Sequence, residues 1–129
     1  MSDDAYMNEV AEAKKVVPTM TCETFWKREE QGDRPTVLDV RERWEWEAGH
    51  IDEATHLPLS QVKTDIEKLF PEKNEEIIIC CATDNRSALA GKQLMEMGYT
   101  NVNYLSGGYS GYCCGLDNPA ATAKEETES

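Results

Sequence analysis

Apolar and polar positions along the chain follow two repeats, one typical of buried strands and one of amphipathic helices. Three consecutive β-branched residues, Ile77, Ile78 and Ile79, predict a buried strand. Shorter apolar runs predict further strands at residues 36–40, 55–58 and 102–105. Strands that alternate with helices predict an α/β fold, in which a central, mostly parallel sheet is covered by helices on both faces.

Helices are predicted between these strands from the 3.6-residue repeat and from residues that begin or end helices. Val10, Ala13 and Val17 share one face of a helix over residues 3–17. The other predicted helices cover residues 22–31, 42–48, 60–70 and 86–97, and a short one begins at the glycine pair 107–108. Four aromatic side chains are expected to pack inside the domain: Phe25, Trp26, Trp44 and Trp46.

The length and charge of the chain indicate a single acidic domain. We expect a helical extension over residues 1–17, a domain over 18–115 and an acidic, disordered tail over 116–129. The formal net charge of -12 disfavours nucleic acid and anionic membranes as partners. No apolar run approaches the length of about 18 residues that a membrane span needs. The acidic N-terminus lacks the basic and apolar regions of a secretion signal, which predicts a cytoplasmic protein.

The chain has five cysteines: Cys22, Cys80, Cys81, Cys113 and Cys114. They form a poor disulfide framework, because their number is odd and the last four are two pairs of neighbours. Neither pair has the C-x-x-C spacing and the chain has only two histidines, so we expect no metal site. Reactive or buried thiols in a reducing compartment fit this pattern better. No organic cofactor is expected either.

The stretch that follows the strand at 77–80 combines a cysteine, a short polar loop and a helix that begins at Arg86 and Ser87. The first N–H groups of a helix have no partner within it, so they and the loop N–H groups converge into a cradle for an anion. A helix N-terminus stabilises an anion by up to about 2 kcal/mol. We therefore expect Cys81 to be a reactive thiolate. Strand alternation directs Cys80 into the core instead.

Four segments of the chain occur in a familiar order. They are Leu38-Asp-Val-Arg41, Gly49-His-Ile51 with Ala54 and Leu57-Pro58, Cys81-Ala-Thr-Asp-Asn-Arg-Ser87, and Leu105-Ser-Gly-Gly108. Together, over residues 37–112, they resemble the rhodanese-like sulfurtransferase family. The resemblance implies a rhodanese-like fold with five strands and a persulfide carried on Cys81. The implied sulfur donor is thiosulfate, polysulfide or a protein persulfide, and the implied acceptor is a thiol or cyanide.

The resemblance also implies the roles of individual residues. Cys81 would be the nucleophile, inside a substrate-binding loop formed by Ala82, Thr83, Asp84, Asn85, Arg86 and Ser87. Arg86 would bind an anionic donor or stabilise the thiolate. Arg41 would also bind substrate, while Asp39 would orient Arg41 or accept loop N–H bonds. His50 would contact these groups and not the substrate. A structural role is favoured for His50 over that of a base, because transfer between thiolates needs no strong base.

Two positions depart from the family pattern. Asp84 stands where glycine is common, which costs backbone freedom and brings a carboxylate near the thiolate. At about 6 Å and an effective dielectric near 20, the repulsion would be roughly 3 kcal/mol. Either Arg86 offsets this charge or Asp84 points outward, and we hypothesise that Asp84 disfavours thiosulfate, a dianion. Glu53 replaces a small residue and is expected to alter only a surface turn.

Two other functions remain open from the sequence. Cys80 and Arg86 have the C-x5-R spacing of phosphatases and arsenate reductases, which bind a tetrahedral oxyanion. We favour Cys81 because the Arg-Ser pair then has the sulfurtransferase spacing. A non-catalytic sulfur carrier or regulatory module is the other alternative. Cys113 or Cys114 could supply a second thiol that takes sulfur from Cys81, although packing or exposed thiols is the default interpretation.

Overall fold

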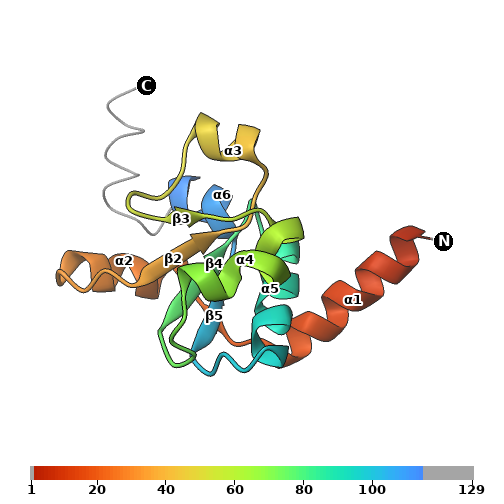
Figure 1. Cartoon of the computed structure of the whole chain (residues 1–129). Helices are drawn as coiled ribbons and strands as arrows, with labels where there is room; N and C mark the ends of the chain where they lie inside the picture. The colour runs from red at the N-terminus through yellow and green to blue at the C-terminus, as the bar shows by residue number, and fades with distance from the viewer. Residues whose placement is uncertain (1, 115–129) are drawn as a thin grey trace.

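A computed structural model describes residues 2–114 and shows a five-stranded sheet between two layers of helices (Figure 1). The elements, in chain order, are α1 (Ser2–Val16), β1 (Thr19–Met20), α2 (Cys22–Glu30), β2 (Thr36–Asp39), α3 (Arg43–Ala48), β3 (Thr55–His56), a 3-10 turn (Leu59–Gln61), α4 (Val62–Leu69), β4 (Ile77–Cys80), α5 (Asn85–Glu96), β5 (Val102–Leu105) and α6 (Gly108–Cys114). The predicted fold class is confirmed. The predicted acidic tail at 116–129 lies outside the described residues.

The strands are ordered β1-β5-β4-β2-β3, and every pair is parallel. Four of these strands were predicted, whereas β1 was not, because two residues after Pro18 are too short to show a repeat. β1 joins the sheet edge through backbone bonds from Tyr104 N to Pro18 O, at 3.0 Å, and from Ser106 N to Met20 O, at 2.8 Å. With β4 in the middle, the residues that follow β2, β4 and β5 meet at one edge of the sheet.

Successive residues of the central strand face two different hydrophobic cores. Ile77, Ile79 and Cys81 lie in the core beneath α1, α4 and α5. Ile78 and Cys80 lie in the second core, beneath α2 and α6. The two adjacent cysteines therefore face opposite sides of the sheet, as strand alternation predicted.

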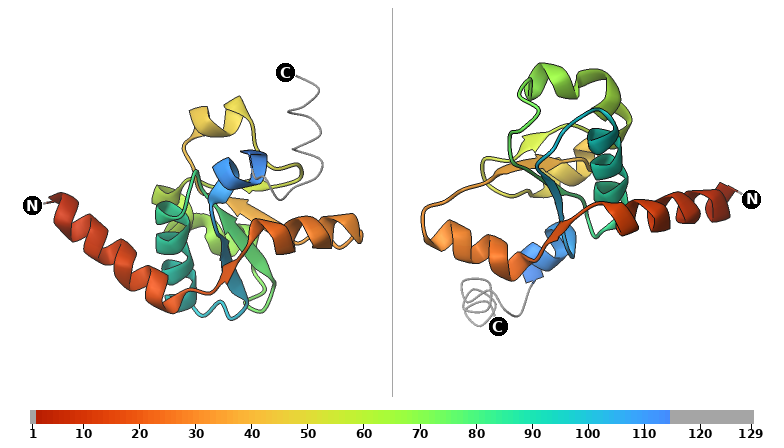
Figure 2. Two further views of the ribbon diagram at one scale, coloured as in Figure 1. Left: turned by 180° about the vertical axis from the view of Figure 1, so that it is seen from behind. Right: turned by 90° about the horizontal axis from the view of Figure 1, so that it is seen from below.

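The N-terminal helix α1 packs along α5 through its C-terminal half (Figures 1 and 2). Val10, Ala13 and Val17 are buried there, as predicted. Gly91 of α5 permits the close approach, because a Cβ at this position would lie 2.6 Å from Cγ1 of Val17. The N-terminal half of α1 projects away from the domain (Figure 2). Among the described helices, none combines the length and the apolar character that a membrane crossing requires.

Two further details differ from the sequence prediction. The helix expected at 60–70 starts with a 3-10 turn, in which Gln61 N donates to Pro58 O at 2.8 Å, before α4 begins at Val62. The prediction that Trp44 packs inside is wrong, since this side chain is 73% exposed. The short helix α3 turns Glu45 inward and leaves its neighbour Trp44 in solvent.

Candidate active site

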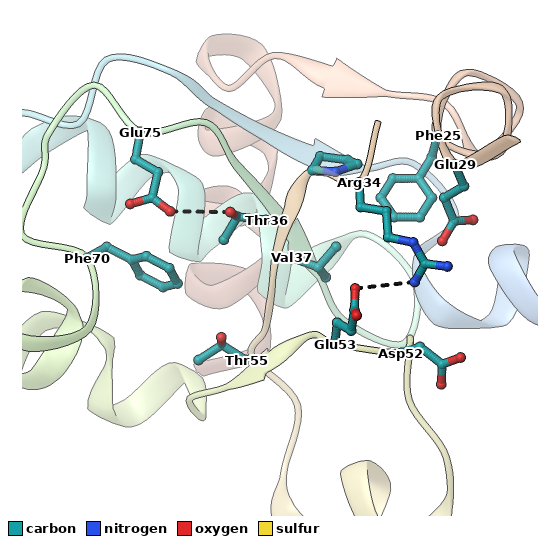
Figure 3. Close-up of a pocket in the computed structure, with 11 residues that line it drawn as sticks. Phe25, Glu29, Arg34, Thr36, Val37, Asp52, Glu53, Thr55, Phe70 and Glu75 are labelled. Atoms are coloured by element: carbon teal, nitrogen blue, oxygen red, sulfur yellow. Dashed lines mark hydrogen bonds and ion pairs between the residues drawn. The ribbon is translucent and has the colours of Figure 1, made fainter. Parts of the chain in front are cut away.

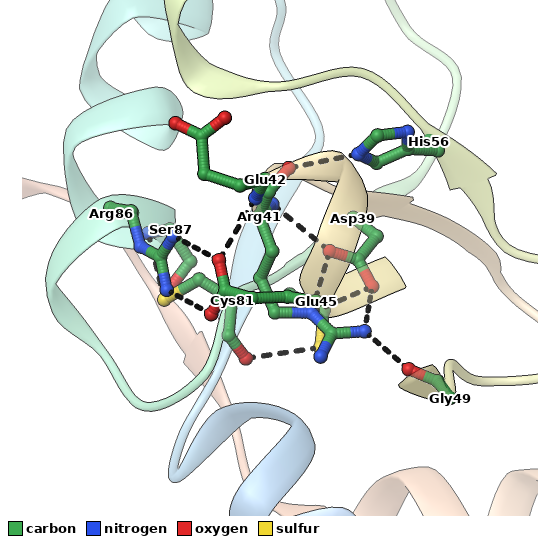
Figure 4. Close-up of polar contacts among 10 residues, drawn as sticks. Asp39, Arg41, Glu42, Glu45, Gly49, His56, Cys81, Arg86 and Ser87 are labelled. Carbon is green, nitrogen blue, oxygen red and sulfur yellow. Dashed lines mark hydrogen bonds and ion pairs between the residues drawn. The ribbon is translucent and has the colours of Figure 1, made fainter. Parts of the chain in front are cut away.

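Cys81 directly follows β4, and its sulfur lies at the beginning of α5 (Figure 4). The N–H of Ser87, in the first turn of α5, donates to Cys81 Sγ over 3.2 Å. Ser87 Oγ lies 3.3 Å from the same sulfur and donates to Asp84 O at 3.1 Å. Cys81 is only 1% exposed. The predicted contact between this sulfur and the helix N-terminus is therefore present, in a site almost closed to solvent.

Cys80 occupies a different environment on the other face of the sheet. It is 0% exposed, and its thiol donates to Cys81 O at 3.5 Å. Burial raises the pKa of Cys80 well above its ordinary value, and the nearby charge of Asp39 raises it further. A protonated, enclosed thiol is a poor nucleophile. Of the two adjacent cysteines, Cys81 is the one whose sulfur lies at the beginning of α5.

The loop after Cys81 is held by the N-terminus of α6. Tyr109 N donates to Cys81 O at 2.7 Å, and Ser110 N donates to Ala82 O at 3.1 Å. Gly108 makes this contact possible, since it has a φ of 59° and a Cβ there would lie 2.8 Å from the carbonyl carbon of Ala82. Because these loop carbonyls point at α6, the N–H groups of the same trans peptides point away from it. This orientation leaves them available to a ligand.

Asp84 directs its carboxylate at the turn between β5 and α6. Oδ1 accepts the N–H of Gly107 at 2.7 Å, so Asp84 does not cap α5 with its side chain. Its φ of -126° is ordinary for an L residue, so the expected backbone cost does not arise. Its charge still acts nearby: burial first and Asp84 second raise the pKa of Cys22 to about 11.

Arg86 donates both of its terminal nitrogens to Glu45 of α3, over 2.7 and 2.9 Å (Figure 4). Glu45 Oε1 also accepts the N–H of Glu42 at 2.9 Å, which begins α3. The hydrogen bonds from Arg86 hold the pKa of the Glu45 carboxyl at about 2, although burial opposes the shift. Sequence reasoning had missed Glu45. Its capping position in α3 was visible, but its partner is 41 residues away.

Asp39 and Arg41 form a second ion pair at the end of β2. The Asp39 oxygens accept Nε of Arg41 at 3.0 and 3.1 Å and Nη2 at 2.8 Å. Nη2 also donates to Gly49 O at 2.8 Å, and the guanidinium lies 4.5 Å from the ring centre of Tyr109. Asp39 is 1% exposed and Arg41 4%. Of the two roles predicted for Asp39, the structure shows the orientation of Arg41.

Replacing Asp39 with Asn is expected to lower the free energy of unfolding by about 3 kcal/mol, because Arg41 would remain buried without a counter-charge. Urea denaturation followed by circular dichroism measures the change. Glu53→Gln is the matched control, since Glu53 pairs with Arg34 at 3.2 Å on the exposed surface. The control should change stability by less than about 1 kcal/mol. Equal losses of unfolding free energy in the two variants would contradict the claim that the buried pair stabilises the fold more than the exposed one does.

The remaining predicted residues lie beside this group. His50 is exposed, stacks on Trp46 with 3.4 Å between ring centres, and places Nδ1 2.8 Å from Trp46 O. His56 was not singled out by the sequence, yet its Nε2 lies 2.8 Å from Arg41 O. Cys113 is a free, exposed cysteine on α6. Its role as a second thiol stays a prediction. The side chain of Cys114 lies outside the described residues.

A separate cavity of about 340 Å³ lies at the amino end of β2, away from Cys81 (Figure 3). Its lining is mostly apolar and acidic and includes the pair between Arg34 and Glu53. Glu53 has a φ of 69°, a conformation that favours glycine, which explains why a small residue suits this turn.

Within residues 2–114, no three His, Cys, Asp or Glu side chains are grouped to hold a metal ion.

Comparison with known proteins identifies the family. The rhodanese-like domain model matches residues 21–113. The chain belongs to the rhodanese-like domain family. This rhodanese-like chain is 34% identical over 70 residues to "Thiosulfate sulfurtransferase PspE" of Escherichia coli (strain K12), which covers 54% of the chain and 67% of PspE. The family includes single-domain proteins such as PspE.

Two further relatives complete the comparison of this rhodanese-like protein. It is 31% identical over 86 residues to "Putative sulfur carrier protein YrkF" of Bacillus subtilis (strain 168); this covers 67% of the chain but only 45% of YrkF. It also superposes on the solution structure of the rhodanese-like domain of the Alr3790 protein from Anabaena sp., with a TM-score of 0.67 and 29% identity. That match covers 74% of this chain and 72% of the Anabaena one.

Proposed function

We propose that this protein is a sulfurtransferase that carries sulfane sulfur as a persulfide on Cys81. The observation that carries the proposal is the hydrogen bond from Ser87 N to Cys81 Sγ at the beginning of α5. A helix N-terminus stabilises an anion, and the thiolate is the form of cysteine that attacks sulfur. The name of PspE supports transfer from thiosulfate, and the name of YrkF supports a carrier role.

Two displacements transfer the sulfur. The Cys81 thiolate attacks the sulfane sulfur of the donor and forms an S–S bond, while the bond to the rest of the donor breaks. The electron pair leaves with that remainder, which is sulfite from thiosulfate or a thiolate from a persulfide. An acceptor thiolate or cyanide then takes the outer sulfur, and the Cys81 thiolate returns. The N–H groups of the loop at 82–86 would hold the charge on the outer sulfur.

Intact-mass spectrometry tests this proposal directly. The protein is incubated with thiosulfate and, separately, with polysulfide, and then with cyanide. A mass increase of one sulfur atom that cyanide removes supports a sulfurtransferase. Loading that no acceptor discharges supports the carrier alternative. If neither reagent adds sulfur, the proposed function is wrong.

Oxyanion chemistry at Cys80 has less support. A ring from Cys80 to Arg86 would need the Cys80 sulfur at the carboxyl edge of the sheet, but this sulfur lies in the core beneath α2 and α6. Its raised pKa also disfavours the thiolate that attack on a phosphate ester requires. We therefore propose that the active loop begins at Cys81 and ends at Arg86 and Ser87, the spacing of sulfurtransferases.

Asp84→Gly is expected to raise the rate of loading from thiosulfate about threefold, because it removes a negative charge near the path of a dianion. The factor is smaller than the first estimate of the repulsion implies, because the carboxylate is turned toward the N–H of Gly107. Asp84→Asn is the matched control: it removes the charge but retains an acceptor for the N–H of Gly107. Initial loading rates at low ionic strength measure the effect. Both variants should gain by a similar factor. Equal rates in the native protein and Asp84→Gly would refute the hypothesis that Asp84 disfavours thiosulfate.

A further inference from the structure

Glu45 forms an ion pair with Arg86, the arginine that an anionic sulfur donor would approach. Two parallel N–H···O bonds, of 2.7 and 2.9 Å, join its carboxylate to both terminal nitrogens of Arg86. The two side chains are partly enclosed, with 13% exposure for Glu45 and 27% for Arg86. Such two-pronged pairs are strong and geometrically specific. A donor that binds Arg86 must therefore compete with Glu45.

The charged side chains at this edge of the sheet then cancel in pairs. Asp39 neutralises Arg41, and Glu45 neutralises Arg86. Since the pKa of Glu45 is about 2, its carboxylate stays charged at neutral pH. Asp84 adds a further negative charge, held at the turn before α6. These side chains leave no net positive charge for a dianion, whereas the backbone N–H groups can still hold one negative charge.

We propose that Glu45 determines the specificity of the site: by neutralising Arg86, it selects against dianionic donors such as thiosulfate and for persulfides that carry at most one negative charge. Glu45 acts through Arg86 and touches no reacting sulfur, so it is a positioning residue. This inference rests on the proposed function for its biological meaning. Charge selection at Cys81 can nevertheless be measured without any sulfur transfer.

Two alkylating reagents measure this charge selection. Iodoacetamide is neutral and iodoacetate is an anion, and both form the same kind of thioether with the thiolate and release iodide. The ratio of their rate constants at Cys81, followed by peptide mass spectrometry, cancels the thiolate fraction. Glu45→Gln should raise the iodoacetate-to-iodoacetamide ratio about tenfold, because Arg86 becomes free to attract the anion.

Glu47→Gln is the matched control. Glu47 lies on the same helix and loses the same charge, but it is exposed and pairs with Arg43 at 3.1 Å. The control should leave the ratio within about twofold of the native value. The increase in Glu45→Gln should also fall as salt is added, since salt screens an uncompensated charge. An unchanged ratio in Glu45→Gln, or an equal increase in Glu47→Gln, overturns the proposal.

A double-mutant cycle separates charge from structure. Arg86→Gln should lower the ratio, because Glu45 then repels the anion, and the double variant should return it to about the native value. A purely structural disturbance would not reverse in this way. If Arg86→Gln fails to fold, the comparison of Glu45→Gln with the double variant still decides the result. A double variant that keeps the raised ratio contradicts the proposal.

Sulfur donors give the second readout. Glu45→Gln should raise kcat/KM for thiosulfate about tenfold, mainly through a lower KM, and change that for methyl persulfide less. The two proposals fail in different ways. If the alkylation ratio shifts but no variant loads sulfur, charge selection stands and the proposed sulfurtransferase function is wrong. If the native protein loads sulfur but the ratio does not shift, the role of Glu45 is wrong.

Discussion

We expect Cys81→Ser to abolish persulfide loading and Cys80→Ala to retain most of it. A serine hydroxyl at the start of α5 accepts the Ser87 N–H but supplies no thiolate to attack the donor sulfur. Cys80 is enclosed in the opposite core, and its removal leaves only a small cavity there. Intact-mass spectra after incubation with thiosulfate or polysulfide, recorded for both variants, measure the difference.

The paired design makes the outcome decisive. Both variants lose one thiol from adjacent positions, so a general effect of cysteine loss would appear in both. Loading that survives in Cys81→Ser and disappears in Cys80→Ala would assign the nucleophile to Cys80. In that case the C-x5-R ring ending at Arg86, and oxyanion substrates, would become the leading interpretation.

Gly108→Ala should reduce the rate of persulfide loading at least about a hundredfold, although it changes a residue outside the loop. An added Cβ would collide with the carbonyl oxygens of Cys81 and Thr83 and lie 2.8 Å from the carbonyl carbon of Ala82. Backbone atoms cannot rotate aside as a flexible side chain does, so the loop or α6 must move. The bond from Tyr109 N to Cys81 O, at 2.7 Å, would be strained or lost. Initial loading rates measure the effect.

Gly98→Ala is the control for the cost of the backbone conformation alone. Gly98 has a φ of 100°, but a Cβ there would meet nothing within 4 Å. This variant should lose about 1 kcal/mol of stability from backbone strain and still load sulfur at the native rate. Native loading by Gly108→Ala would show that the loop does not depend on its contact with α6.

Local repeats in the sequence were enough for most of the fold. The period of two along a strand is local backbone geometry, so residues 77–81 predicted that Cys80 and Cys81 face opposite sides of the sheet. The 3.6-residue repeat likewise predicted the buried face of α1. Among the strands of residues 2–114, β1 alone was missed, because a two-residue strand carries no repeat and depends on pairing with β5.

The candidate site likewise combines features that local sequence predicts with contacts between residues that are distant in the sequence. The placement of Cys81 and of the loop that leads from it to Ser87 follows from residue types at short spacing, because strand, loop and helix N-terminus are continuous in the chain. The partners of that loop lie far away in the sequence: Gly107 N donates to the carboxylate of Asp84, and Arg86 donates to Glu45, 41 positions away. Such contacts depend on where α3 and α6 rest above the sheet. The sequence by itself therefore determined which sulfur lies at the helix N-terminus, and only the tertiary structure decided which charged side chains lie near it.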